Sequence, residues 1–357
     1  MATVAQRIII PSAPGIFRTI FLYTGQGDAT LMVIPNGYEY LYVLLDSDKD
    51  KEPNEVNLVK MFKDLFEERQ KLNVFINTHP HNDHIGGINE LYDEIGIIEV
   101  WHSNHKPGGK HKDKYEELKY VINAVGNENE FHLKGTNTND QVEDINGNGV
   151  NKKLGDVEFV VFSPATYLCE EIDEANPDER DRRIHEQCGV MKFTYGQEAK
   201  SILMTGDSDK CAWKDHIMYH QDKLSATFLH ASHHGSDTFF KDGDEEAYKE
   251  HIDAIAPDYV IVSAPKKDKS PYGHPDDEAM KIYREYVGKK NVYHLGEKPC
   301  CVIVDIDMNG GLSIREDFDL IEAYKDDGDD NNGDKNVAKA FSIRTGVSEP
   351  RKDELFA

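Results

Sequence analysis

VFINTHPHNDHIGG, residues 74–87, is the stretch that decides the fold. Its apolar beginning predicts a strand, and directly after it come His79, His81, Asp83 and His84. Alternate residues of an extended segment point the same way, so the first two histidines can face one ion while the other two side chains reach a second. Imidazole and carboxylate are ligands that suit Zn²⁺, and they also accept Mn²⁺ or Fe. A polar turn of surface histidines is the alternative, and it does not explain this spacing.

The overall composition limits the class of protein. The 357 residues include 66 Asp and Glu against 41 Lys and Arg, a net charge of −25. This balance argues against non-specific binding to duplex nucleic acid and leaves nucleic acid as a substrate only through the site itself. Five cysteines without a CxxC pair favour a reducing compartment over a disulfide framework. Because no apolar segment approaches the ~20 residues that span a bilayer, we expect a cytoplasmic protein without a membrane partner. The oligomeric state stays open.

Apolar runs separated by amphipathic segments predict the architecture. Strands are expected at 18–34 (two strands), 39–46, 73–77, 97–101, 156–163, 188–195, 200–205, 224–230, 258–263, 291–295 and 300–307. Helices are expected at 55–69, 88–94, 113–125, 209–220 and 276–287, and 164–183 is expected to be irregular. This order fits the α/β class, as two facing sheets with helices outside, a four-layer αββα sandwich. We expect one domain over 1–324, with a loop insertion at 126–152, and an acidic, disordered tail over 325–357.

Polar residues stand at the carboxyl ends of several predicted strands. They are Asp46, His79, Asp207, His233, His234 and Ser263. Because strand ends of a layered fold meet along one edge, we expect these side chains to converge on a single site. For Asp207, which follows Thr-Gly, a simple turn residue is the alternative.

The pattern HxHxDHxGG after a strand resembles the loop that marks the metallo-β-lactamase fold superfamily. That superfamily completes its site with a later histidine, an aspartate and a final histidine, and His185, Asp207 and His234 take these places here. The resemblance implies two divalent ions, Zn²⁺ first and Mn²⁺ next. It assigns one ion to His79, His81 and His185, the other to Asp83, His84 and His234, and both to Asp207. His233 is the alternative to His234, and a surface position in an acidic stretch is the alternative for His185.

Three further motifs resemble a narrower branch of that superfamily. TGQGDAT (24–30), HHGS (233–236) and YGHP (272–275) are similar to motifs in the hydrolase domain of competence (ComEC-type) DNA-uptake proteins and their stand-alone relatives. The resemblance covers roughly residues 18–305. The chain departs from it twice: those relatives usually carry asparagine where His185 stands, and Asp-x-Gly where Asp46-Ser47-Asp48 stands.

His274, in Gly-His-Pro between a strand and a helix, is a candidate for catalysis together with Asp83. His274 could donate a proton to a leaving oxygen or bind a phosphate, and a turn or capping residue is the alternative. Lys266, Lys267 and Lys269 lie just upstream, where a phosphate contact would be needed, although a solvated lysine loop explains them equally well. The candidate substrate-binding residues are His233, Ser236, Lys266, Tyr272 and His274.

Two metal ions that share a hydroxide would attack a phosphorus or a carbonyl centre. We therefore expect a dinuclear metal-dependent hydrolase of phosphodiesters, a nuclease or a nucleotide phosphodiesterase. Hydrolysis of acyl bonds in a lactone, thioester or β-lactam is the alternative with the same ions. A non-catalytic regulatory member of a defence or DNA-uptake system is the third hypothesis, and the full set of candidate ligands argues against it.

Overall fold

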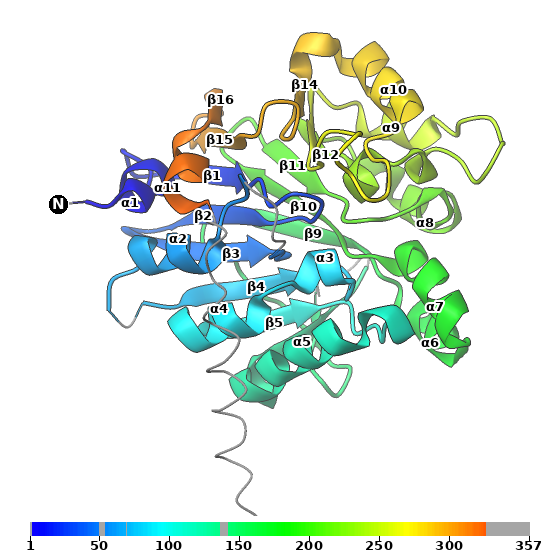
Figure 1. Cartoon of the computed structure of the whole chain (residues 1–357), viewed down its shortest axis with the longest axis horizontal. Coiled ribbons are helices and arrows are strands. Elements are labelled where there is room, and N and C mark those ends of the chain that lie inside the picture. Colours follow the sequence, from blue (N-terminus) through cyan, green and yellow to red (C-terminus); the bar gives the residue numbers. More distant parts are fainter. Residues whose placement is uncertain (1, 50–53, 69, 136–141, 326–357) are drawn as a thin grey trace, which may run out of the picture.

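The computed structural model describes residues 2–49, 54–68, 70–135 and 142–325 (Figure 1). Two β-sheets face each other, and helices cover the outer side of each sheet, so the predicted αββα arrangement is confirmed. None of the helices within these ranges is both long and apolar enough to cross a membrane.

The larger sheet has ten strands in the order β16-β15-β1-β2-β3-β4-β5-β6-β7-β8. The strands from β3 to β6 pair in parallel, and the remaining neighbours pair antiparallel. Their bounds are β1 Ile16–Phe21, β2 Thr30–Asn36, β3 Glu39–Leu45, β4 Leu72–Asn77, β5 Ile97–His102, β6 Glu130–Leu133, β7 Val142–Glu143, β8 Gly149–Val150, β15 Cys301–Asp307 and β16 Leu312–Asp317.

The smaller sheet has six strands in the order β14-β13-β12-β11-β10-β9. The strands from β11 to β14 run parallel, so their carboxyl ends share one edge, while β9 and β10 are antiparallel additions. Their bounds are β9 Glu158–Ser163, β10 Val190–Tyr195, β11 Lys200–Met204, β12 Phe228–His230, β13 Tyr259–Val262 and β14 Val292–His294.

The helices form two outer layers. Those on the ten-stranded sheet are α1 Val4–Ile9, α2 Leu58–Leu65, α4 Ile88–Ile95, α5 Lys112–Val125 and α11 Asp319–Tyr324. Helices α8 Lys210–Asp215, α9 Glu250–Ile255 and α10 Asp277–Val287 lie on the side of the smaller sheet. Helix α3 Asn82–Ile85 lies in the loop after β4 and contacts α5, while α6 Thr166–Glu174 and α7 Pro177–Arg183 contact each other. Short 3₁₀ turns are η1 Gly109–His111, η2 Asn127–Asn129, η3 Ile184–Gln187, η4 Ile217–Lys223, η5 Ser232–Gly235, η6 Asp237–Phe239 and η7 Lys289–Asn291.

Helix α2 shows how the sequence builds an outer layer. Asn57 begins it by accepting a hydrogen bond from the backbone N–H of Lys60, which satisfies one of the unpaired donors of the first turn. Its buried side chains are Leu58, Met61, Phe62 and Leu65. This 3–4 spacing puts them on one face, which packs on the sheet.

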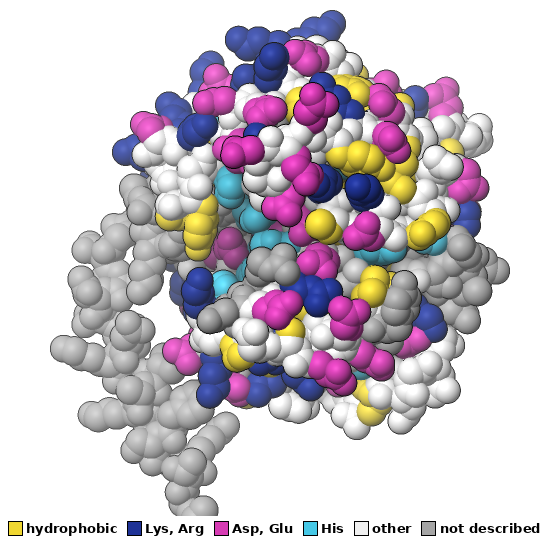
Figure 2. Space-filling model, turned by 90° about the vertical axis from the view of Figure 1, so that its right-hand side faces the viewer, with side chains coloured by type: hydrophobic (Ala, Val, Ile, Leu, Met, Phe, Trp, Pro, Cys, Tyr) yellow, Lys and Arg dark blue, Asp and Glu magenta, His cyan; other side chains and the backbone are white. Residues whose placement is uncertain are grey.

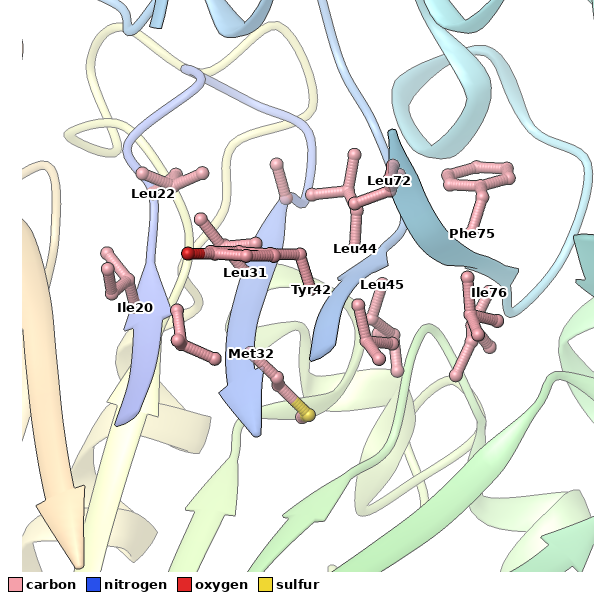
Figure 3. Packing of buried hydrophobic residues seen from close by; sticks show 14 of the residues in the cluster. Ile20, Leu22, Leu31, Met32, Tyr42, Leu44, Leu45, Leu72, Phe75 and Ile76 are labelled. Carbon is pink, nitrogen blue, oxygen red and sulfur yellow. The ribbon is translucent and has the colours of Figure 1, made fainter. Parts of the chain in front are cut away.

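The main core lies between the two sheets and under the helices of the larger one, and a second cluster lies behind the smaller sheet. Figure 3 shows Leu31 of β2 and its register partner Leu44 of β3, and Leu45 of β3 beside its register partner Ile76 of β4. Because consecutive strand residues point to opposite faces, the unbroken apolar runs of these strands supply side chains to both the inter-sheet core and the helical layer.

Two expectations about irregular segments need correction. The expected loop at 126–152 contains β6, β7 and β8, which extend the larger sheet at its edge. Strand β6 is only four residues long, with Phe131 and Leu133 buried on one face, so its alternating pattern is too short to stand out among Asn, Gly and Asp. Helices α6 and α7 occupy most of 164–183, where no regular element was expected. The predicted tail lies outside the described residues beyond 325, and the domain boundary at 324 stays a prediction.

Candidate metal centre

The parallel strands bring the polar strand-end residues to one edge of the sandwich. Strand β4 leads into His79 in the larger sheet, while β11 leads into Asp207 and β12 into His233 and His234 in the smaller one. Figure 2 shows the resulting face, where histidine side chains gather in a hollow that has acidic side chains around it. The predicted convergence of strand ends is confirmed by these positions.

The first group of potential ligands consists of His79, His81 and His185, whose ring nitrogens all lie within 4.8 Å of one another. His81 Nδ1 and His185 Nε2 are 3.1 Å apart. Two of these residues come from the loop after β4, and His185 comes from η3, which packs beside it. The structure therefore places His185 at the site, with 15% of its side chain exposed, and not on the outer surface.

The second group consists of Asp83, His84 and His234, again with ligand atoms within 4.8 Å of one another. His234 Nε2 lies 3.6 Å from Asp83 Oδ2, so the last histidine of the chain's HHGS motif completes this group. His233 and His234 both have positive φ angles, 50° and 55°. Such left-handed backbone is unfavourable for residues other than glycine. Two successive residues held in it by the surrounding fold are typical of a functional site.

Asp207 lies between the two groups and offers one carboxylate oxygen to each. Its Oδ1 is 3.2 Å from His84 Nε2 and 3.7 Å from His234 Nε2. Its Oδ2 is 3.6 Å from His79 Nε2 and 3.7 Å from His185 Nε2. A carboxylate in this position can bridge two ions, one in each group.

The buried polar atoms of the site fit cations. Within the described part of the chain, five of them have no hydrogen-bond partner: His79 Nε2, His81 Nε2, His84 Nε2, His234 Nε2 and Asp207 Oδ1. Buried polar atoms without partners are costly, and imidazole nitrogens that converge with carboxylates are the donor set of divalent transition metals. The residues therefore fit two divalent ions.

The ionisation equilibria at the site point the same way. Burial lowers the pKa of His79, and the neighbouring His84 and His81 lower it further, which keeps the ring neutral. Burial also lowers the pKa of His84, but Asp207 and Asp46 outweigh it and raise that pKa well above its usual range. Burial raises the pKa of Asp207, and the surrounding histidines reverse this and hold it well below its usual range. The carboxylates thus favour positive charge at this place, which a bound cation would supply.

Asp46, at the end of β3, orients His84. Its Oδ2 accepts hydrogen bonds from His84 Nδ1 at 2.9 Å and from the Thr78 hydroxyl at 2.6 Å. Because the proton of the imidazole then sits on Nδ1, the lone pair on Nε2 faces Asp207. His234 is held in the same way, since its Nδ1 donates to the carbonyl oxygen of Ser263 at 3.0 Å.

The GQGD turn supports the metal loop. The backbone N–H of Asp28 donates to the carbonyl oxygen of Asp83 at 3.1 Å. A Cβ at Gly27 would lie 2.3 Å from that same oxygen, so only glycine fits here. Gly27 also donates its N–H to Asp48 Oδ2 at 3.2 Å. The turn therefore fixes the backbone from which Asp83 and His84 project.

The same turn holds the loop that carries His274. Ser270 donates its hydroxyl to Gln26 Oε1 at 2.6 Å, and accepts hydrogen bonds from the backbone N–H groups of Tyr272 and His274. Gln26 and Ser270 are 244 residues apart in the sequence, and their contact joins the TGQGDAT motif and the loop of the YGHP motif into one structural unit.

The candidate substrate-binding residues occupy different positions around the centre. His233 Nε2 is 3.6 Å from Asp207 Oδ2, and the ring of His274 lies 5.2 Å from that of His233. Tyr272 is 65% exposed, and its ring is stacked 6.4 Å from that of His274. Ser236 uses its hydroxyl to cap η6 through the N–H of Thr238. Lys266 is exposed, and its carbonyl oxygen closes the 266–270 turn.

Three residues at the centre have contacts there that the sequence does not reveal. His111 stacks on His81 with ring centroids 4.1 Å apart and accepts the N–H of Asn82. Cys188 accepts the N–H of Asp207 at 3.2 Å through its sulfur. Asp46 is expected at the site as a strand-end residue, but its hydrogen bond to His84 is not. The position of Asp46 after an apolar strand and before a helix-forming segment can be recognised in the sequence, whereas His111 and Cys188 lie in no motif that points to the site.

A separate group of potential ligands, His102, Glu130 and His132, lies where β5 pairs with β6. His102 Nδ1 accepts the backbone N–H of Asn104 at 3.1 Å, so its proton sits on Nε2, which faces Glu130 at 3.2 Å. A protonated nitrogen has no lone pair for a metal. The two imidazoles instead lower the pKa of Glu130 to about 2. We interpret this group as a structural hydrogen-bond network.

Comparison with known proteins agrees with this geometry. Residues 48–167 match the model of the metallo-beta-lactamase superfamily. This match covers 120 of the 357 residues. The matched segment includes the loop from His79 to His84 and ends before His185. No curated protein matches the chain.

Solved structures similar to this chain include the following three. Igni18, a metallo hydrolase from the archaeon Ignicoccus hospitalis, has 14% identity and a TM-score of 0.45, over 84% of this chain and 99% of that one. A metallo-beta-lactamase from Cronobacter sakazakii has 13% identity and a TM-score of 0.31, over 58% of this chain and 72% of that one. A metallo-beta-lactamase superfamily protein from Sulfolobus tokodaii has 16% identity and a TM-score of 0.26, over 55% of this chain and 64% of that one.

Proposed function

We propose that this protein is a dinuclear metal-dependent hydrolase that cleaves phosphodiester bonds in a nucleic acid or nucleotide. The observation that carries the proposal is the position of Asp207, whose two oxygens face two separate groups of potential ligands, with His233 and His274 beside them. The superfamily match over 48–167 supports a metal-dependent hydrolase in general. The choice of phosphodiesters rests on the two additional histidines and on the competence-type motifs.

The proposed ligands are the two groups described above, with Asp207 shared. Bound divalent ions, Zn²⁺ or Mn²⁺, would act as Lewis acids and lower the pKa of a coordinated water toward neutrality. The chain's own contribution is orientation: Asp46 and the Ser263 carbonyl fix the proton of His84 and His234 on Nδ1.

His274 is the proposed proton donor to the leaving oxygen, and His233 the proposed hydrogen-bond partner of a phosphoryl oxygen. His274 Nδ1 is 3.3 Å from Asp276 Oδ2, an orientation that leaves Nε2 for substrate. Tyr272, exposed and stacked beside His274, offers an aromatic face to a base.

The charge around the centre favours a short substrate. Lys267, on the loop that carries His274, is paired with Asp277 at 2.8 Å. Lys241 is paired with both Asp237 and Glu278. Since these lysines are already neutralised in a protein of net charge −25, long polyanions gain little from them. We therefore propose a nucleotide-sized or single-stranded substrate, whose diester bond enters the metal centre.

The experiment measures metal content and turnover on the same sample after addition of Zn²⁺ or Mn²⁺. The panel contains bis-p-nitrophenyl phosphate, single-stranded DNA and RNA, cyclic nucleotides, a lactone and nitrocefin. The expected result is bound metal together with phosphodiester turnover. Turnover of the lactone or nitrocefin without phosphodiester turnover would show an acyl hydrolase, and a protein that retains no metal would rule out both enzymes.

A pair of variants tests the role of His274. His274→Ala should lower phosphodiester turnover by roughly 10²–10⁴-fold without loss of metal, as expected for removal of a general acid. His132→Ala is the matched control, because its side chain is similarly exposed, 17% against 13%, and its ring is also 3.3 Å from a carboxylate oxygen. Equal effects of the two substitutions would contradict the assignment.

A further inference from the structure

Outside the metal centre, a thiol, an imidazole and a carboxylate lie in a row, with the imidazole in the middle. Cys169 and Asp173 are four residues apart on α6, so both side chains point to the same side of the helix. His105, from the loop after β5, lies against that side. Cys169 Sγ is 3.4 Å from His105 Nε2, and Asp173 Oδ1 is 3.8 Å from His105 Nδ1.

The arrangement suits proton transfer and not metal binding. The sulfur and the carboxylate face different nitrogens of the same ring, so one ion cannot reach both. A nucleophile beside a base that a third group orients is the geometry of an activated nucleophile. His105 is 2% exposed, and its Nδ1 makes no hydrogen bond within the described residues, which leaves Asp173 as the group that it faces.

The electrostatics of His105 agree with this geometry. Burial lowers the pKa of His105, but the neighbouring Cys169 and Asp173 outweigh it and raise that pKa to about 10. His105 Nε2 donates to the carbonyl oxygen of Gln187 at 3.1 Å, so its proton is shared between that oxygen and the sulfur of Cys169 at 3.4 Å. Gln187 stands two residues after His185, so this group borders the metal centre.

A small cavity gives access to the sulfur. Its volume is about 80 Å³, and Cys169 lines it together with Ser103, Pro164, Glu143 and Glu170. The volume admits a slender molecule only, because one water takes up roughly 30 Å³ in the liquid. Glu143 is paired with Lys134 and Asp173 faces His105, so Glu170 is the carboxylate of the lining that repels anions and attracts cations.

We propose that Cys169 is a modification site, a nucleophilic thiol that forms mixed disulfides with small neutral or cationic disulfides. Cys169 Sγ attacks one sulfur of the reagent, so that a new S–S bond forms and the old one breaks. His105 holds the proton that the thiol gives up and passes it to the departing thiolate, which leaves as a free thiol. Asp173 keeps the ring of His105 in place.

The wild-type protein itself supplies the first test. All five cysteines are free, and Cys211 is more exposed than Cys169, but burial and Asp209 raise the pKa of Cys211 to about 11. On treatment with cystamine, peptide mass spectrometry should show the mixed disulfide at Cys169 at least about tenfold faster than at Cys211. The dianionic dithiodiglycolate should react more slowly than cystamine at Cys169. Reaction at Cys211 that equals or exceeds reaction at Cys169 would overturn the proposal.

Two variants test the roles of the partners. His105→Gln should slow the reaction of Cys169 by about tenfold or more and leave that of Cys211 unchanged. Asp173→Asn removes only a charge at a half-buried position, and it should slow the reaction of Cys169 by a smaller factor. This second variant keeps the proposal testable if His105→Gln does not fold. An unchanged rate at Cys169 in a folded His105→Gln protein would refute the role of the imidazole.

Discussion

Replacing Asp46 by asparagine should remove His84 as a metal ligand without changing the shape of the site. Asp46 Oδ1 accepts N–H groups from Thr78 and Asn77, at 2.8 and 3.1 Å, so the oxygen of the new amide stays there. The amide nitrogen then takes the place of Oδ2 and faces Thr78 Oγ1 and His84 Nδ1. The hydroxyl can turn round and accept, but the imidazole can accept only if its proton moves to Nε2. That nitrogen faces Asp207 at 3.2 Å and is the proposed ligand atom.

The expected loss of metal affinity follows from the loss of the buried carboxylate charge of Asp46. Asp46 and His84 are both fully buried, and a hydrogen bond to a charged group contributes about 1.5–3 kcal/mol. This corresponds to roughly a 10–100-fold loss of metal affinity, the usual range when a carboxylate behind a ligating histidine is removed. Thr78→Val, which deletes a hydroxyl but leaves the carboxylate, should change the affinity by less than about threefold.

Competition with a chromophoric chelator measures the affinity, and metal analysis of the dialysed protein gives the stoichiometry. Circular dichroism and the unfolding midpoint show whether the fold is kept. If Asp46→Asn binds metal as tightly as the wild type, the proton of His84 does not decide its role and the reasoning fails.

Two further predictions concern the first ligand group and the core. His185→Asn should lower the metal content by about one ion per chain, because the first ligand group loses one of its three imidazoles. An unchanged metal content would show that His185 is not a ligand. His251 is fully buried among aromatic rings, and burial lowers its pKa to about 3. Since the depressed pKa favours the neutral form in the folded state, stability is lost as the pH falls from 6.5 towards 3, by about 2 kcal/mol between pH 8 and pH 5. Denaturant unfolding of His251→Leu should show a pH dependence smaller by that amount, and an equal dependence would contradict the assignment.

The sequence predicts the parts of the molecule whose physics is local. The strand before His79 and the spacing of the four ligands lie within one short stretch, and apolar runs with polar ends place Asp207 and His234 on the same edge. The layered fold follows from the same runs, since strands that are apolar on both faces must be covered on both sides.

The remaining features depend on contacts between distant segments. His111 reaches His81 because of the way η1 and the start of α5 pack on the metal loop, and nothing in its own neighbourhood signals this. Strand β6 exists because β5 offers it an edge to pair with, so its own four residues carry little pattern. His185 was uncertain because η3 follows an acidic segment, and only the packing of η3 against the loop after β4 turns its ring inward.

The GQGD turn explains why motifs at opposite ends of the chain occur together. Through the N–H of Asp28 it supports the backbone of Asp83, and through the amide of Gln26 it holds Ser270, which in turn fixes the N–H groups of Tyr272 and His274. Asp83, a proposed ligand, and His274, a residue proposed to meet the substrate, are therefore attached to the same four-residue turn. A shift of either loop alone would break one of these hydrogen bonds, so the turn helps to set the distance between the metal centre and His274, together with the hydrogen bond from the N–H of Asp276 to the carbonyl oxygen of Gly235.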